Sequence, residues 1–253
     1  MLGEWLLPEG EQSGSSFHQS LVDAWFMSGP SNSDKPSSIT GVMGNEMILK
    51  NFAFTSESGF GEGNYEGALV FDGVDDYGIC NNLPILNDYT VICRREIINK
   101  ESGAIASKRT SSSQWDGAFI FERNNQLTSF GQNNYRTIQQ NNVSYMTTTS
   151  YNGGTISRGS LQDTEYLVLG AAGFNIDLNR AHEFSNCAIY YFALYNKSLT
   201  PEEIETEKER LNEEWLKRTE TDEDTTAEYP FPLLDEEDIT NSPEWSDPEQ
   251  EII

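Results

Sequence analysis

The sequence is dominated by short apolar segments that are separated by clusters of Gly, Asn, Ser and Asp. Such clusters end β-strands, and a side-chain period of two indicates a strand with one buried face. The segment 89–95 alternates in this way, with Tyr89, Val91 and Cys93 on one side. Further short strands are expected over 68–71, 77–80, 103–108, 117–122, 127–130, 143–150 and 165–170. Many short strands at close spacing predict an all-β sandwich or jelly roll.

The longest apolar segment, 184–195, has no polar side. One side carries Cys187, Ile189, Tyr191 and Ala193, and the other carries Ala188, Tyr190, Phe192 and Leu194. Because both sides are apolar, this segment predicts a strand that is covered on both faces.

A single helix is predicted after this strand, over 200–218. Thr200 and Glu203 have the spacing of a capping box, and Pro201 occupies the first helical position. The residues at helical spacing that predict a buried stripe are Ile204, Leu211 and Trp215. The glutamates expected to face solvent are Glu205, Glu207 and Glu209. Packing against the sandwich is favoured for this helix, and binding to a partner protein is the alternative.

The chain is strongly acidic, with 41 Asp and Glu against 16 Lys and Arg and a formal net charge of −25. Residues 219–253 hold 13 acidic residues and no Lys or Arg, which leaves residues 1–218 with a net charge of −12. Attraction to nucleic-acid phosphates is therefore absent, and a nucleic-acid partner is not expected. No segment approaches the ~20 apolar residues of a membrane helix. Residues 1–8 lack the basic and apolar regions of a secretory signal.

Both ends of the chain differ from the body. Residues 1–20 predict an N-terminal arm, and residues 219–253 predict an acidic tail that is either disordered or a docking segment. The tail also holds apolar residues that a segment serving solubility alone would not need. They suggest that the tail docks onto a basic surface of another protein. These candidate partner-binding residues are Tyr229, Phe231, Leu233, Leu234 and Trp245.

The turn 72–76 is a candidate cation site, because Asp72, Asp75 and Asp76 cluster there. Calcium is a hard cation that prefers such carboxylate and carbonyl oxygens. Asp and Gly are also the residues that a tight turn requires, with the carboxylates capping backbone N–H groups. Calcium binding and a purely structural turn are both left open, and no other cofactor is expected.

No constellation of catalytic residues is present. A retaining glycosidase needs two carboxylates about 5 Å apart, and no predicted strand carries alternating acids. With two histidines, His18 and His182, and no Gly-x-Ser-x-Gly, a serine-hydrolase triad has little support. The three cysteines are far apart in the sequence and predict buried free thiols rather than disulfides or a zinc site. A non-enzymatic protein is expected.

Residues 68–77, Ala-Leu-Val-Phe-Asp-Gly-Val-Asp-Asp-Tyr, resemble the strand–turn–strand signature of laminin-G-like, concanavalin A-like jelly-roll domains. Residues 88–93, 104–108, 151–159 and 188–204 are similar to that family's later strands, hairpin and closing strand with helix. The resemblance covers 21–218 and implies a two-sheet antiparallel jelly roll with one C-terminal helix and an acidic tail. It implies no single function, because this fold hosts lectins, adhesion modules and hydrolases.

A narrower resemblance involves segments 21–29, 41–45 and 51–54, together with the Asp-Tyr-Gly that ends at Gly78. These are similar to proteins of bacteriophages that infect gut Bacteroidota, including crAss-like phages, in which such domains are virion components. The resemblance implies a head fibre or capsid decoration, assembled in the host cytoplasm and docked on a capsid or portal component. The jelly roll would be displayed for adhesion to a host surface glycan. A free carbohydrate-binding lectin is the alternative, a polysaccharide hydrolase is less favoured, and a homo-oligomer is left open.

Overall fold

A computed structural model of the protein describes residues 16–99, 103–109, 117–123, 126–129, 132–135, 143–156, 163–175 and 179–220. The chain divides into two units, Met1–Thr219 and Glu220–Ile253. All described residues except Glu220 belong to the first unit. Most of the predicted arm and the apolar residues of the predicted tail lie outside the described residues, so the predicted domain boundaries stay predictions.

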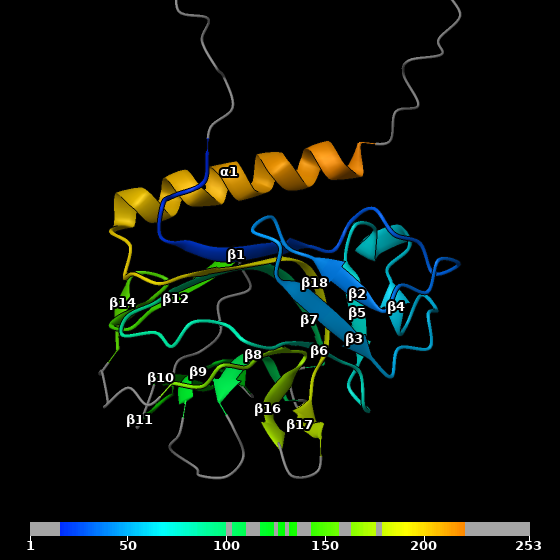
Figure 1. Ribbon diagram of the computed structural model, residues 1–253, viewed down its shortest axis with the longest axis horizontal. Coiled ribbons are helices and arrows are strands. Elements are labelled where there is room, and N and C mark those ends of the chain that lie inside the picture. The colour runs from blue at the N-terminus through cyan, green and yellow to red at the C-terminus, as the bar shows by residue number, and fades with distance from the viewer. Residues whose placement is uncertain are drawn as a thin grey trace, which may run out of the picture. The chain divides into compact units, whose positions relative to one another are not determined.

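The first unit is a sandwich of two antiparallel β-sheets (Figure 1). Sheet A has the order β14 (Gly154–Thr155), β13 (Ser150–Tyr151), β12 (Val143–Thr147), β7 (Thr90–Asn99), β18 (Asn186–Tyr195), β5 (Leu69–Asp72) and β4 (Gly59–Phe60). Strand β1 (Leu21–Phe26) also pairs with β18. A short 3-10 helix, η1 (Gly63–Tyr65), lies between β4 and β5 in the chain.

Sheet B has the order β11 (Gln132–Tyr135), β10 (Gln126–Ser129), β9 (Gly117–Arg123), β8 (Ala104–Arg109), β15 (Leu167–Leu169), β6 (Tyr77–Cys80), β3 (Glu46–Lys50) and β2 (Ser38–Thr40). A separate hairpin of β16 (Ala171–Asn175) and β17 (Arg180–Phe184) packs on the outer face of this sheet. There, Phe174 and Ala181 join an apolar cluster with Tyr77 and Ile79 of β6 and Val168 of β15.

The main core lies between the two sheets. Trp25 of β1, Phe71 of β5 and Phe121 of β9 are fully buried in it. Tyr89, Val91 and Cys93 face this core, as their predicted alternation requires, and Ile92 lies on the opposite face of β7. The three cysteines are free and buried, which confirms the prediction made for them.

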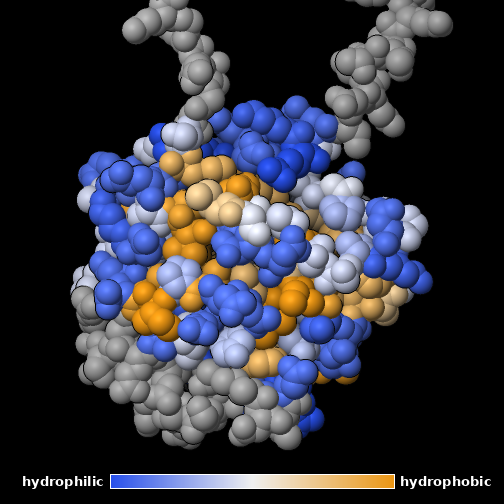
Figure 2. Space-filling model, viewed as in Figure 1, coloured by the Kyte–Doolittle hydropathy of each residue, from blue (hydrophilic) through white to orange (hydrophobic). Residues whose placement is uncertain are grey.

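The outer face of sheet A is covered by α1 (Pro201–Thr219). Its predicted stripe of Ile204, Leu211 and Trp215 is buried there, and Figure 2 shows that the outward surface of the helix is hydrophilic. The capping box is formed: the Glu203 N–H donates to Thr200 Oγ1 at 3.2 Å, and the Thr200 N–H donates to Glu203 Oε2 at 2.8 Å.

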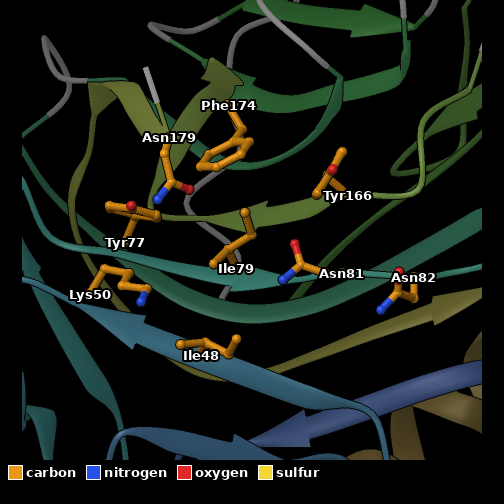
Figure 3. A pocket seen from close by; sticks show the side chains of 9 residues that line it. All are labelled: Ile48, Lys50, Tyr77, Ile79, Asn81, Asn82, Tyr166, Phe174 and Asn179. Atoms are coloured by element: carbon orange, nitrogen blue, oxygen red, sulfur yellow. The ribbon is translucent and has the colours of Figure 1, made fainter. Parts of the chain in front are cut away.

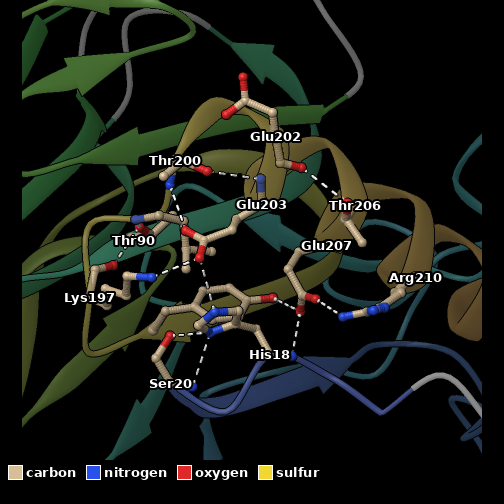
Figure 4. Close-up of polar contacts among 12 residues, drawn as sticks. His18, Ser20, Thr90, Lys197, Thr200, Glu202, Glu203, Thr206, Glu207 and Arg210 are labelled. Carbon is tan, nitrogen blue, oxygen red and sulfur yellow. Dashed lines mark hydrogen bonds and ion pairs between the residues drawn. The ribbon is translucent and has the colours of Figure 1, made fainter.

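The prediction that Glu207 faces solvent is wrong, because its side chain is 1 % exposed. Its carboxylate accepts hydrogen bonds from the Tyr195 hydroxyl at 3.0 Å and the His18 N–H at 3.1 Å (Figure 4). Arg210 also pairs with it. The carboxylate thus joins the N-terminal segment, β18 and α1, whereas Glu205 and Glu209 are exposed as predicted.

Strand β18 is buried on both faces as predicted, but its alternation is not regular. The register with β7 shifts between Ile189, which pairs with Arg95, and Tyr191, which pairs with Arg94. An extra residue in one strand reverses the faces of every side chain beyond it. The residues that face the inter-sheet core are therefore Cys187, Ile189, Phe192 and Leu194, and those on the α1 side are Tyr191, Ala193 and Tyr195.

The predicted fold class is confirmed: the described residues form an all-β, two-sheet antiparallel jelly roll with one α-helix at their C-terminal end. Within the described residues, no helix combines the length and hydrophobicity that a membrane span needs.

Candidate functional site

A pocket with a volume of about 400 Å³ lies on the outer face of sheet B, beside the hairpin β16–β17 (Figure 3). Its described lining combines apolar, aromatic and amide side chains with one cation. The lining residues are Ile48, Lys50, Tyr77, Ile79, Asn81, Asn82, Tyr166, Phe174 and Asn179.

The floor of the pocket is set by the pairing of two neighbouring strands. Ile48 of β3 lies opposite Ile79 of β6, and Lys50 lies opposite Tyr77. Side chains alternate along a strand, so these four project outward while Met47 of β3 enters the inter-sheet core. The same register that builds the core therefore brings Lys50 beside an aromatic ring.

Three aromatic rings form an apolar wall. The ring centroid of Phe174 lies 5.5 Å from that of Tyr166 and 6.5 Å from that of Tyr77. Tyr77 and Phe174 are each 5 % exposed, whereas Tyr166 is half-buried and keeps part of its ring accessible. Burial raises the pKa of the Tyr77 hydroxyl, so that group stays neutral at physiological pH. The two buried rings hold Tyr166 in place, and Tyr166 supplies the accessible aromatic surface.

Three asparagines contribute neutral polar groups. Asn81 and Asn82 follow β6, and Asn179 precedes β17. The backbones of Asn82 and Asn179 have φ values of 61° and 48°, a left-handed conformation that asparagine tolerates better than most residues. None of the three side-chain amides hydrogen-bonds to another described residue. Each amide thus offers two donors and an acceptor to a ligand.

Lys50 is the one cation among the described residues of the pocket lining. Its side chain is exposed, and it forms no ion pair with a described residue. Among the described residues that line the pocket, none is an Asp or Glu. The site can therefore hold a polar molecule that has an apolar face and several hydrogen-bonding groups.

The structure also brings together the three aspartates that the sequence singled out. One carboxylate oxygen of each of Asp72, Asp75 and Asp76 lies within 4.8 Å of the others. The predicted turn role is visible, since Asp72 Oδ1 accepts the Val74 N–H at 2.7 Å and Asp76 Oδ2 accepts the Asp72 N–H at 3.1 Å. The role of these residues as calcium ligands stays a prediction.

Asp76 differs from its two neighbours because it is fully buried. Burial raises the pKa of its carboxyl group to about 6, although a hydrogen bond from Ser58 acts in the opposite direction. Its Oδ1 has no hydrogen-bond partner among the described residues. A group in this state is either protonated or compensated by a nearby positive charge.

The candidate partner-binding residues of the tail lie outside the described residues, so the prediction made for them is untested. The pocket itself was missed at the sequence level. The pair Asn81 and Asn82 directly after a predicted strand was a usable signal. Phe174 and Asn179 gave no such signal, because they reach the site through the fold of a hairpin far from β6 in the sequence.

No family model and no curated protein sequence matches this chain. Among solved structures, the chain is similar to Trypanosoma rangeli sialidase in complex with 2,3-difluorosialic acid, with 14% identity and a TM-score of 0.47. That match covers 74% of this chain and 32% of the sialidase, so the chain spans about a third of the sialidase's length.

The chain is also similar to the binding domain of botulinum neurotoxin serotype D, with 13% identity, a TM-score of 0.45 and coverage of 76% and 52% of the two chains. A third similar structure is the binding domain of botulinum neurotoxin DC in complex with SialylT, with 10% identity, a TM-score of 0.45 and the same coverage. At this identity the likeness concerns the fold alone, and it transfers no residue role, ligand or activity to this chain.

Proposed function

We propose that this protein is a non-enzymatic glycan-binding module, that the pocket on sheet B holds the sugar, and that a bacteriophage virion displays the module. Its function is adhesion, with the jelly roll as a rigid support for the pocket.

The lining of the pocket carries this proposal. A sugar ring has C–H groups on its faces and hydroxyl groups around its edge. The accessible part of Tyr166 can pack against a face, and the amides of Asn81, Asn82 and Asn179 can exchange hydrogen bonds with the hydroxyl groups. An apolar pocket with a few convergent polar groups is the usual form of a small-molecule site.

Binding is favoured over hydrolysis by the same lining. Glycoside hydrolysis generally uses an acid and a second carboxylate on opposite sides of the scissile bond. In the part of the lining that the structure describes, no residue is an Asp or Glu. The described lining residues can recognise a sugar, and they do not include the carboxylate pair that bond cleavage generally uses.

The virion role rests on the sequence resemblance of segments 21–29, 41–45 and 51–54 to phage proteins. In this proposal the acidic tail, 219–253, docks on a basic surface of a capsid or portal component. A free lectin is the competing function, and proteomics of purified virions separates the two.

A glycan array probed with the full chain tests the binding function. The Tyr166→Ala variant should lose at least tenfold in affinity for any glycan that the wild type binds. The matched control is Tyr65→Ala, because Tyr65 is also half-buried but lies in η1, outside the pocket. Absence of binding across the array, or equal effects of the two variants, would overturn the proposal.

Truncation of residues 219–253 tests the docking role. The shortened chain should remain folded, because the described core lies within the first unit, and should be missing from purified particles. Phe231→Ala combined with Trp245→Ala should weaken docking through lost apolar contact, and added salt should weaken it through screening. Normal incorporation of the truncated chain would leave the tail as a solubility segment.

A further inference from the structure

We infer that the pocket on sheet B selects glycans that carry a carboxylate, and that Lys50 is the residue that recognises this group. The inference rests on the proposed function and adds the chemical class of the sugar.

The position of Lys50 supports a recognition role. It ends β3 directly opposite Tyr77, with its side chain on the same outward face as the pocket floor. The aliphatic part of a lysine side chain commonly lies along an apolar surface while the ammonium stays in water. In Figure 3 the side chain lies at one side of the pocket, among the other lining residues.

A common structural reason for a lysine on a strand does not apply here. Lysines protect the edge strands of sheets against pairing with other chains. Strand β3 is not an edge strand, because it lies between β2 and β6 in sheet B. Lys50 also lacks a described carboxylate partner, so its charge is not used within the described part of the fold.

The net negative charge of the body makes the presence of Lys50 in the pocket informative about the ligand. Residues 1–218 carry a net charge of −12, and such a surface repels anionic ligands. A pocket on this surface whose described lining holds one cation and no carboxylate departs from the general trend. Only a short-range contact such as an ammonium–carboxylate pair can overcome the general repulsion, since the more distant charges are screened.

One lysine matches a singly charged carboxylate. A phosphate monoester carries about −1.5 to −2 at neutral pH and is usually held by several cations or by Arg. The neighbouring amides of Asn81 and Asn82 can donate to the second carboxylate oxygen and to the adjacent hydroxyl groups. The chemistry shared by uronic acids and sialic acids, a carboxylate on a polyhydroxylated ring, fits this arrangement.

The test compares acidic and neutral probes on the full chain by calorimetric titration. The probes are tri-galacturonic acid, its carboxyl-reduced galactose counterpart, and the pair sialyllactose and lactose. The wild type should bind at least one acidic probe roughly tenfold more tightly than its neutral counterpart, because hydrogen bonds to charged groups are the stronger ones. The relative affinities of the two acidic probes identify the source of the carboxylate.

The Lys50→Gln variant should lose this preference while neutral binding is unchanged, and Lys50→Arg should retain part of it. The matched control is Lys217→Gln, an exposed lysine on α1 at the other sheet, which should change neither affinity. Equal affinity for acidic and neutral probes, or a preference that survives Lys50→Gln, would overturn the inference.

The outcomes separate this inference from the proposed function. If neutral probes bind, depend on Tyr166 and ignore Lys50, the glycan site stands and the carboxylate selectivity is wrong. If neither acidic nor neutral probes bind, both the proposed function and the inference fail.

Discussion

The outer faces of the two sheets are covered in different ways. On sheet A, the apolar stripe of α1 (Ile204, Leu211 and Trp215) packs against the strands, and the side chains beneath it are buried. On sheet B, the hairpin β16–β17 covers part of the face with Phe174 and Ala181, and the pocket lies beside it. Both coverings use aromatic residues, Trp215 of α1 and Phe174 of the hairpin.

The two faces differ more clearly in whether their polar groups have hydrogen-bond partners. Under α1, the Tyr195 hydroxyl and the His18 N–H both donate to Glu207. In the pocket, the three amides and Lys50 have no partner among the described residues. A buried polar group left unpaired costs about 1–3 kcal/mol, so such groups persist where water or a ligand can reach them. We therefore attribute stability to the α1 face and recognition to the pocket face.

The largest effect is expected from Trp215→Ala on the α1 face. The Trp215 ring lies edge-on to Tyr190 at 5.6 Å and 4.0 Å from the Arg94 guanidinium, and its Nε1–H donates to the Gly67 carbonyl at 3.0 Å. Loss of these contacts should lower the free energy of unfolding by about 3–5 kcal/mol. Denaturant unfolding measures this loss. Glycan affinity of the variant under folding conditions should equal that of the wild type, and a lower affinity would mean that the two faces are coupled.

A smaller effect is expected from Glu207→Ala on the same face. The variant leaves the Tyr195 hydroxyl and the His18 N–H without their shared acceptor, which should lower the free energy of unfolding by about 2 kcal/mol. The control Glu209→Ala removes an exposed carboxylate from the same helix and should change stability by less than about 0.5 kcal/mol. Equal losses in the two variants would mean that Glu207 is not a structural residue.

Asn82→Gly in the pocket should lower glycan affinity rather than stability, the reverse of the pattern expected for the α1 variants. Glycine accepts the left-handed backbone of this position and removes only the amide. Glycan affinity should fall by about two- to tenfold, the equivalent of one neutral hydrogen bond, with little change in unfolding. Asn64→Ala in η1 is the control for loss of an exposed asparagine outside the pocket. Destabilisation without loss of affinity would make Asn82 a structural residue, like those under α1.

The sequence predicted the α1 face better than the pocket face for a physical reason. Helix α1 carries local signals, the capping box and the stripe of Ile204, Leu211 and Trp215, and both were confirmed. The buried Glu207 could not be predicted, because its partners Tyr195 and His18 come from other elements. The irregular register of β18 was likewise invisible in a strand whose two sides are both apolar.

The other features that the sequence did not predict depend on residues that come together only in the tertiary structure. The segments 21–29 and 41–45 are in contact: the Asp23 carboxylate accepts the N–H groups of Met43 at 2.8 Å and Asn45 at 2.9 Å. A Cβ atom at Gly41 would lie 2.3 Å from Asp23 Oδ1, which explains the glycine. Strand alternation could have placed Lys50 on an outward face, but its position beside Tyr77 required the β3–β6 register.

A pH-dependent effect is expected in the turn between β5 of sheet A and β6 of sheet B, which belongs to neither outer face. Burial raises the pKa of Asp76 to about 6 in the folded chain, from 3.8. A group whose folded pKa is raised favours folding while it is protonated, so this contribution is present below pH 4 and is lost as pH rises through 6. Asp76→Asn should remove that pH dependence from the midpoint of thermal unfolding, and the glycan affinity of the pocket should not change.

Calcium provides a second measurement on the same turn. An ion held by Asp72, Asp75 and Asp76 would compensate the buried charge of Asp76, so it should stabilise the wild type at pH 7 more than at pH 5. At tenfold excess over its dissociation constant, the stabilisation is about 1.4 kcal/mol, because a ligand that binds only the native state shifts the folding equilibrium. Asp76→Asn should abolish the response. If calcium and a chelator leave the unfolding midpoint of the wild type unchanged at pH 7, the aspartates serve the turn alone, through hydrogen bonds to backbone N–H groups such as that of Val74.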